Sequence, residues 1–236
     1  MYEGGFKAWE GGEALARLLA GDARPGAPVW GGGELAAGAR AAASRSLAGL
    51  SILELGAGAA LPSLVAARRG AAALDLADYN PSVLECLTAV NVREATAGRG
   101  RACAVRFWAG DWRGLAGVRR VGRDAAAAAA AAAATAAGTA PSSPSTPPWA
   151  LILAAEVTYA PESLAPFLDC LAKCLHAGGA LALVAAKRYY FGVGGGSADL
   201  VAGAVGAGLE AGVVASTGGG GVEVPIDVVA VRRRRG

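Results

Sequence analysis

The sequence has few of the residues that build metal centres or membrane spans. It holds one histidine and four cysteines in 236 residues, and no two cysteines form a CxxC pair, so a zinc-ligand set cannot be assembled. No run of about 18 strongly apolar residues occurs, and alanine accounts for much of the mean hydropathy of +0.39. The 36 glycines lack a three-residue period, which excludes collagen. The chain is predicted to be globular and not to span a bilayer.

The length of 236 residues fits one α/β domain, so we predict a single domain over residues 1–236. The first residues show no secretory or organellar leader pattern. The cysteines are interpreted as buried reduced thiols of a cytosolic protein; they are Cys86, Cys103, Cys170 and Cys174. Four arginines at 232–235 contribute to the net charge of +3. A solvated tail is the favoured interpretation, and a weak nucleic-acid or nuclear-targeting patch is the alternative.

Short apolar runs alternate with glycine turns and helical stretches from residue 51 onward. Residues 51–79 indicate strand, turn, helix and strand, which is a βαβ unit of a parallel sheet. Asn80 and Pro81 begin the next helix. Further strands are expected at 103–109, 149–155 and 180–186, with a helix over 161–176 that ends at the lone histidine, His176, interpreted as a C-terminal cap. Two last strands, 212–216 and 222–231, predict an antiparallel hairpin at one end of the sheet.

One low-complexity block interrupts this pattern. Ten alanines occupy residues 125–134, and a Thr/Ser/Pro-rich stretch continues to Pro148. Polyalanine favours a helix but buries little surface, and the proline-rich part cannot continue it. We interpret residues 117–148 as an insertion without an assigned function.

A glycine turn follows the first of these strands and precedes a helix. Gly56 and Gly58 lack a Cβ, so a ligand can approach the backbone closely at free helix N–H groups. Asp78 lies 20 residues after Gly58, where a carboxylate can accept both ribose hydroxyls of an adenosine. Asp75 is the competing carboxylate, but it would fall inside the strand, where an unpaired charge is costly.

Polar residues also end the next strands. Gly110, Asp111 and Trp112 follow one strand and could offer adenine an acceptor and an aromatic wall, although a Trp that closes a strand more often belongs to the core or a lid. Glu156 and Tyr159 follow another strand and reach the same carboxyl edge, where open α/β folds bind ligands. Capping or solvation is the alternative role of Glu156.

Two cofactors fit this arrangement, a dinucleotide and S-adenosylmethionine (AdoMet). A dinucleotide site usually has a third glycine that packs the helix on the strand. Here Ala60, Leu61 and Pro62 occupy that stretch. An antiparallel hairpin after five parallel strands also suits the seven-strand methyltransferase pattern, so AdoMet is favoured.

Four strings resemble the seven-β-strand AdoMet-dependent protein methyltransferases, which modify lysine or histidine: LELGAGAALPSLVAARRGA, DYNPSVLECLTAVNV, GDW and LILAAEVTYAPESLAPFL. Two more, YEGGFKAWE at 2–10 and AKRYYFGVGGG at 186–196, are similar to the protein-histidine N-methyltransferases of that group. The resemblance runs from Tyr2 to about Val231, apart from the insertion and a glycine-rich stretch near Gly31. It departs at Ala57 and Ala60, where the family more often has Cys and Gly, and at Ala155, where Ser is common.

The resemblance implies a Rossmann-like α/β fold that binds AdoMet and methylates a histidine ring of a large-subunit ribosomal protein, by a monomer of the cytoplasm and nucleus. It also implies which residues line the cofactor: Trp9, Glu10, Gly56, Gly58, Asp78, Tyr79, Asn80, Gly110, Asp111, Trp112 and Ala155. Glu156 and Tyr159 are the candidates that orient the acceptor. A neutral imidazole needs no strong base before it attacks a methyl group, whereas a lysine must first lose a proton. The alternatives are a protein-lysine methyltransferase and a non-catalytic AdoMet-fold binding module.

Overall fold

The computed structural model describes residues 6–97, 103–112, 119–121, 149–175, 180–192, 194–217 and 224–234, with the backbone alone for residues 119–121. The strands of this part form one sheet in the order β1-β8-β9-β7-β6-β2-β3-β4-β5. They are β1 (Val29–Trp30), β2 (Ser51–Leu55), β3 (Ala73–Asp78), β4 (Ala104–Ala109), β5 (Arg119–Val121), β6 (Leu151–Ala155), β7 (Leu181–Lys187), β8 (Leu209–Ser216) and β9 (Ile226–Arg233).

The centre of the sheet is parallel and its C-terminal part is antiparallel. Strands β4, β3, β2, β6 and β7 pair in parallel, and β9 pairs antiparallel with both β7 and β8. The predicted α/β fold class and C-terminal hairpin are therefore confirmed. Two short strands flank this arrangement, because β1 pairs with β8 and β5 pairs with β4.

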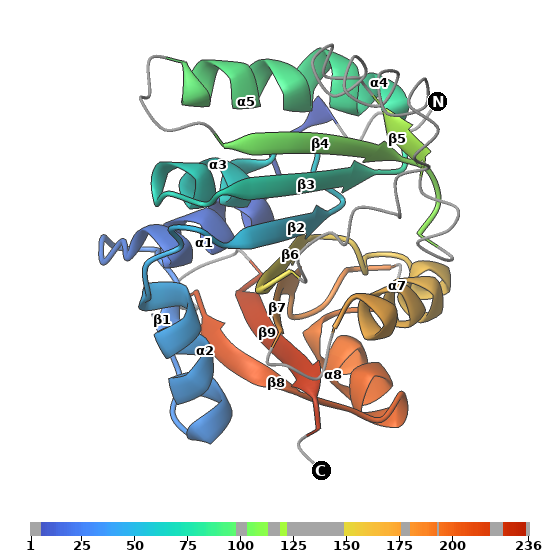
Figure 1. The fold of residues 1–236 in the computed structure, drawn as a ribbon. Coiled ribbons are helices and arrows are strands. Elements are labelled where there is room, and N and C mark those ends of the chain that lie inside the picture. The colour runs from blue at the N-terminus through green and yellow to red at the C-terminus, as the bar shows by residue number, and fades with distance from the viewer. Residues whose placement is uncertain are drawn as a thin grey trace, which may run out of the picture.

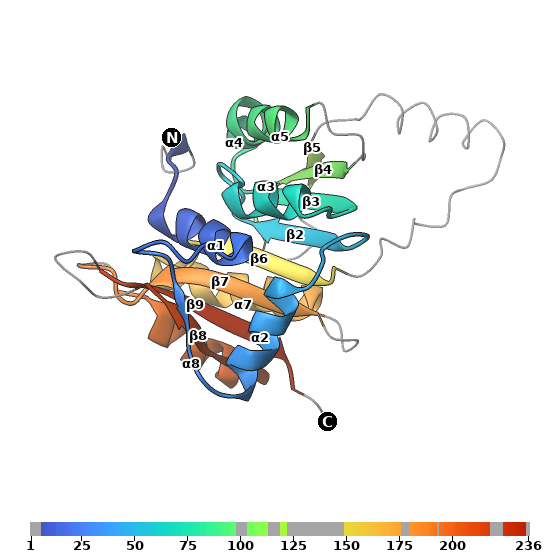
Figure 2. The ribbon, with the colours of Figure 1, turned by 90° about the vertical axis from the view of Figure 1, so that its left-hand side faces the viewer.

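Helices cover both faces of the sheet (Figures 1 and 2). One layer holds α1 (Glu10–Ala20), α2 (Glu34–Ser44), α3 (Leu61–Arg68) and α5 (Ala89–Thr96). The other holds α7 (Pro161–Cys174) and α8 (Ser197–Gly206). A short α4 (Pro81–Val83) and a π-helical turn, η2 (Leu84–Thr88), lead into α5. The chain therefore has a three-layer arrangement with the sheet in the middle.

Each central strand contributes to two apolar cores, one on each face. On β6, Leu151 and Leu153 face the core under α1 and α3, while Ile152 and Ala154 face the core under α7 and α8. This alternation follows from the two-residue period of a strand. Because helices cover both faces, both sets are apolar, as is usual for parallel sheets.

Local signals account for some helix ends and not for others. Asn80 caps α4, because its side chain accepts a hydrogen bond from the Ser82 amide at 3.0 Å, as predicted. The sequence did not indicate β1, α1, α2 or β5. Residues 31–44 are rich in glycine and alanine, and α2 is fixed by packing its buried alanines against the sheet.

The arginines of the C-terminal end bond to the fold. Arg232 pairs with Glu210 on β8 at 2.7 Å. Arg233 donates to the Leu175 carbonyl at 2.5 Å, and Arg234 donates to the Leu209 carbonyl at 3.3 Å. The prediction of a solvated tail is therefore wrong for Arg232, which is half-buried, whereas Arg233 and Arg234 are exposed and yet bonded to the fold. Arg235 lies outside the described residues.

The predicted burial of the four cysteines is confirmed only in part. Cys170 and Cys174 are buried as predicted, but Cys86 is exposed and Cys103 is half-buried, because Cys86 lies on the outer side of η2. His176 and residues 122–148 of the predicted insertion lie outside the described residues.

The described ranges contain neither a membrane-spanning helix nor a cluster of metal-ligating side chains. Within them no helix combines the length and apolarity needed to cross a membrane. Among the same residues, no cluster of three or more His, Cys, Asp or Glu side chains could hold a metal ion.

Candidate active site

The predicted site residues converge on one edge of the sheet. Parallel strands end at the same edge, so the residues after β2, β3, β4 and β6 become neighbours. Leu55 of β2 pairs with Ala77 of β3 and with Ala154 of β6, and Asp78 pairs with Ala109 of β4. The glycine turn therefore lies between the end of β3 and the end of β6.

The turn after β2 depends on glycine conformations. Gly56 has φ 70° and Gly58 has φ 46°, in the left-handed region that side chains disfavour. The amide of Gly58 donates to Asp78 Oδ2 at 3.0 Å, and its carbonyl accepts from Thr88 Oγ1 at 2.6 Å. Asn91 holds the next carbonyl, that of Ala59, at 3.0 Å. Thr88 and Asn91 were not predicted; their one signal was a polar residue among apolar neighbours.

Asp78 fastens the turn to the end of β3. Besides the Gly58 amide, its carboxylate accepts the Asn80 amide at Oδ1, at 3.0 Å. Burial raises the pKa of Asp78, and these backbone hydrogen bonds oppose that rise. Each carboxylate oxygen still has a second lone pair for a ligand hydroxyl. Tyr79 beside it is 69% exposed.

Asp75, the competing carboxylate, is occupied within the fold. It is fully buried and pairs with Arg106 at 2.5 Å. The indole N–H groups of Trp108 and Trp149 donate to its two oxygens, each at 2.8 Å. This buried charge is compensated from three directions, so Asp75 has a structural role and Asp78 is the better ligand carboxylate.

The residues after β4 lie against both the turn and the core. The Gly110 amide donates to the Asp78 carbonyl at 3.1 Å, and Asp111 follows it. Trp112 packs edge-on against Phe167 of α7, with ring centroids 5.7 Å apart. A Cβ on Gly56 would lie 3.8 Å from the Trp112 ring. Trp112 therefore serves the core while bordering the glycine turn.

The start of α1 closes the site from the other side. Trp9 is the residue before α1, and the Lys7 ammonium lies 4.6 Å from the centre of its ring. Glu10 lies 3.6 Å from Lys187 at the end of β7. Its pKa is lowered chiefly by its own backbone amide at the helix start, and also by Lys187 and Lys7.

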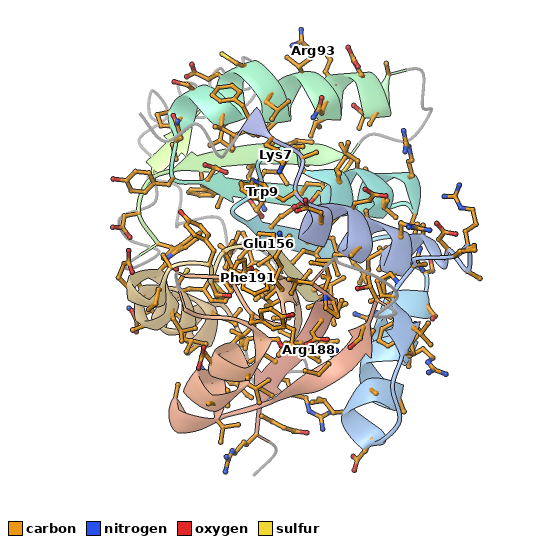
Figure 3. All side chains as sticks on the ribbon, turned by 180° about the vertical axis from the view of Figure 1, so that it is seen from behind. Lys7, Trp9, Arg93, Glu156, Arg188 and Phe191 are labelled. Carbon is orange, nitrogen blue, oxygen red and sulfur yellow. The ribbon has the colours of Figure 1, made fainter. Side chains whose placement is uncertain are left out.

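Glu156 follows Ala155 and is the most constrained acidic residue of the site. It is 7% exposed and has φ 55°, a conformation that costs a non-glycine residue about 1–2 kcal/mol. Gly11 of α1 packs closely on the Glu156 side chain, since a Cβ added to Gly11 would lie only 2.9 Å from it. A Cβ added to Gly12 would lie 4.0 Å from the Ala155 methyl, which is an ordinary contact. In Figure 3, Lys7, Trp9, Glu156 and Phe191 follow one another down the middle of the view.

The Glu156 carboxylate has one paired and one unpaired oxygen. Tyr190 O–H donates to Oε2. Oε1 is buried and has no hydrogen-bond partner among the described residues, and the same holds for Thr158 Oγ1. Burial raises the pKa of Glu156, while the bond from Tyr190 and the charge of Lys187 lower it. The predicted companion Tyr159 is 36% exposed, and the partner that the sequence reasoning missed is Tyr190.

The glycine string 194–196 lets the loop after β7 lie on the segment after β6. Gly194, Gly195 and Gly196 all have positive φ. A Cβ on Gly195 would lie 2.7 Å from the Thr158 carbonyl oxygen, and one on Gly196 would lie 2.5 Å from the Arg188 carbonyl oxygen. Gly195 and Gly196 are therefore required for the close packing of the backbone in this region.

Glu54 is a second buried carboxyl behind the turn. Its Oε2 accepts the Ser63 amide in the first turn of α3 at 3.0 Å. Burial raises the pKa of Glu54 to about 8. The sequence did not single it out, although a charged residue inside the apolar run of β2 was visible.

We expect Glu54 to make stability depend on pH. The folded state binds its proton more tightly than the unfolded chain, so its contribution is complete below about pH 4 and declines as the pH rises to about 8, by at most about 1.4 kcal/mol per pH unit. Glu54→Gln should flatten the unfolding free energy across this range in urea titrations. The exposed Glu94→Gln should retain the wild-type slope, and equal slopes in all three proteins would contradict the buried-carboxyl assignment.

Ala60 offers a test of the backbone at the start of α3. It has φ 58° and is 1% exposed. Ala60→Gly loses a buried methyl but relieves left-handed strain of about 1–2 kcal/mol. Ala66→Gly, in the same core and 0% exposed, loses a methyl and pays the helical glycine penalty of about 1 kcal/mol. Chemical denaturation should find Ala60→Gly less destabilising by at least about 1 kcal/mol; the reverse order would count against the turn geometry.

Comparison with solved structures defines the class of fold. The magnesium protoporphyrin IX methyltransferase (ChlM) of Synechocystis PCC 6803, solved with bound SAH, matches with a TM-score of 0.53 at 14% identity, over 84% of this chain and 80% of that one. TrmN of Thermus thermophilus matches with a TM-score of 0.50 at 17% identity, over 94% of this chain and 48% of that one. The chain therefore has the fold of the AdoMet-dependent methyltransferases.

The chain is also similar in sequence to one protein methyltransferase. The chain is 25% identical over 218 residues to histidine protein methyltransferase 1 homolog of Bos taurus, across 84% of this chain. It spans about half of that relative, 47% of its length. No family model matches the chain. The chain is thus similar in fold to AdoMet-dependent methyltransferases and in sequence to a histidine protein methyltransferase.

Proposed function

We propose that this chain is an AdoMet-dependent protein methyltransferase whose acceptor is a histidine ring. The observation that carries the proposal is the buried Glu156 carboxylate, which keeps Oε1 unpaired among the described residues at the carboxyl edge of the sheet. The likeness to a histidine protein methyltransferase supports the choice of acceptor.

The residues at the edge fit the proposed cofactor. The glycine turn leads directly into the N-terminus of α3, and the positive end of a helix favours a carboxylate such as that of a methionine moiety. Asp78 has lone pairs left for ribose hydroxyls, with Tyr79 and Asn80 beside it. The remaining proposed cofactor contacts come from the other strand ends and the start of α1: Gly110, Asp111, Trp112, Ala155, Trp9 and Glu10.

The chemistry asked of the protein is chiefly positioning. When bound, AdoMet supplies a methyl group on a positively charged sulfur, and displacement by a ring nitrogen leaves the sulfur neutral and moves the charge to the ring. The protein holds the acceptor in line, an effect worth up to about 7–11 kcal/mol. An imidazole with a pKa of about 6.5 is mostly neutral at pH 7 and already has a lone pair.

A lysine acceptor is the second candidate. A lysine ammonium, with a pKa of about 10.4, must lose a proton before attack. Within the described part of the site, Glu156 has a single unpaired carboxylate oxygen, and a neutral imidazole has a single N–H. That match favours histidine. A non-catalytic AdoMet-binding module is the third candidate, and it would keep the cofactor site without methyl transfer.

The proposed substrate is a large-subunit ribosomal protein, on the strength of the sequence resemblance, and the proposed location is the cytoplasm and nucleus. Exposed aromatic rings lie on the segments that flank Glu156: Tyr159 is 36% exposed and Phe191 is 77% exposed. Exposed aromatic side chains of this kind are common in surfaces that bind proteins. They support a macromolecular acceptor over a free metabolite.

The decisive experiment is methyl transfer from labelled AdoMet into ribosomal proteins that lack the modification, followed by mass spectrometry of the labelled residue. Label on histidine supports the proposal, and label on lysine supports the second candidate. Glu156→Gln should lower the rate at least about 100-fold with AdoMet affinity retained, while the exposed Glu94→Gln should behave as wild type. AdoMet binding without label on any ribosomal protein would overturn the ribosomal substrate.

A further inference from the structure

Tyr190 is bonded to Glu156 in a chain of hydrogen bonds that fixes the carboxylate. The Lys187 amide donates to Tyr190 Oη at 3.3 Å, and the Tyr190 O–H donates to Glu156 Oε2. A phenol has one proton to donate, and here that proton is committed to Glu156. The chain runs from the backbone at the end of β7 to a side chain at the end of β6, so two adjacent strands determine the orientation of the carboxylate.

The phenol remains a donor rather than a base. Burial and the negative charge of Glu156 raise the pKa of Tyr190, which keeps its proton in place over the range in which proteins are stable. Tyr190 is itself half-buried. It therefore holds Oε2 and leaves Oε1 as the carboxylate oxygen without a hydrogen-bond partner among the described residues.

The surroundings of Glu156 favour one further hydrogen bond. Gly11 packs on the Glu156 side chain, so that even a Cβ would lie 2.9 Å from Oε1. The Gly11 backbone amide lowers the pKa of Glu156 by hydrogen bonding, although the contact does not give Oε1 a partner of ordinary hydrogen-bond geometry. Lys187 and Glu10 act on the carboxylate with opposite signs. Oε1 is therefore a buried acceptor without a partner of ordinary geometry among the described residues, while Oε2 of the same carboxylate is already satisfied.

Building on the proposed function, we propose that Tyr190 is a positioning residue that holds Glu156 so that Oε1 accepts the N–H of the substrate imidazole. This hydrogen bond selects the ring tautomer in which the opposite nitrogen carries the lone pair. After methylation the ring is a cation, and its N–H proton passes to Oε1, which gives a neutral methylated ring and a protonated Glu156. Release of that proton to solvent restores the carboxylate.

The test compares Tyr190→Phe with Tyr189→Phe. Both variants lose one phenol hydroxyl, but Tyr189 is 46% exposed and packs against Phe191. Tyr190→Phe should lower kcat about 10-fold to 100-fold, the value of a hydrogen bond to a charged group, with the affinity for AdoMet unchanged. Because the Tyr190 bond lowers the pKa of Glu156, its loss should move the acid limb of the rate profile to higher pH. Tyr189→Phe should keep the wild-type profile.

A second readout needs no turnover. Carboxyl ¹³C NMR of glutamate-labelled protein, with the Glu156 signal assigned from its absence in Glu156→Gln, should find the titration of Glu156 displaced to higher pH in Tyr190→Phe and not in Tyr189→Phe. An unmoved titration, or an unmoved rate profile, overturns the role of Tyr190. A wild-type protein that binds AdoMet and methylates lysine instead overturns the proposed function, and with it the imidazole acceptor, even where the NMR displacement is seen.

Discussion

Asp78→Ala is expected to lower the affinity for AdoMet by at least about 100-fold. Hydrogen bonds to a charged group contribute about 1.5–3 kcal/mol each, so two ribose hydroxyls that lose their acceptor account for that factor. The lone pairs left beside the Gly58 and Asn80 amides are the acceptors in question. Titration calorimetry with AdoMet or its demethylated product measures the change directly.

The same substitution should also destabilise the fold, which the sequence alone did not indicate. The sequence assigned Asp78 only the role of accepting the ribose hydroxyls. In the structure it accepts two backbone amides, each at 3.0 Å, and orphaned donors cost about 1–3 kcal/mol. Asp199→Ala, at an exposed position on α8, is the control. Wild-type AdoMet affinity in Asp78→Ala would overturn the site assignment.

Gly56→Ala is expected to destabilise the protein by about 2–5 kcal/mol. The residue has φ 70°, which costs about 1–2 kcal/mol for alanine. The new methyl would also lie 2.5 Å from Val157 Cγ1, and overpacking of this kind costs about 1–3 kcal/mol. Denaturant unfolding should detect both contributions together.

A matched variant separates strain from collision. Gly49 has φ 79°, and a Cβ there meets nothing within 4 Å. Gly49→Ala should therefore destabilise the protein by the cost of backbone strain alone, about 1–2 kcal/mol. Combining Gly56→Ala with Val157→Ala removes the atom that collides, and the pair should be less destabilising than the sum of the single variants by about 1–3 kcal/mol. Strict additivity would mean that the turn avoids Val157 in another way.

Local sequence signals were sufficient for the elements that carry the cofactor turn. Asn80 and Pro81 predicted the start of α4. The glycine turn and Asp78 predicted that β2 and β3 are neighbouring parallel strands. These signals lie within about 30 residues of one another and depend on backbone conformation and capping. These signals predicted the α/β methyltransferase fold, and the similarity to a solved methyltransferase confirms that fold.

Contacts between residues far apart in the sequence could not be predicted from such local signals. The bond from Tyr190 to Glu156 joins positions 34 residues apart, in the segments that follow β7 and β6, and Tyr159 was the nearer tyrosine in sequence. The alanine-rich α2 and the two-residue β1 have almost no period of their own, so packing decides them. The cofactor contacts, the single-domain boundary and the cellular location stay predictions, since they depend on ligands and partners.

The Asp75 cluster has a consequence for how long the connection before β6 can be. The connection before β6 has two anchor points on the sheet. The first is β5, which pairs with β4, and the second is Trp149, whose indole N–H donates to Asp75 of β3. Both anchor points lie on neighbouring strands, and closing a longer loop adds only about 0.6 kcal/mol per doubling of its length. A change in the number of residues between these two anchor points is therefore expected to leave the position of Glu156 unchanged.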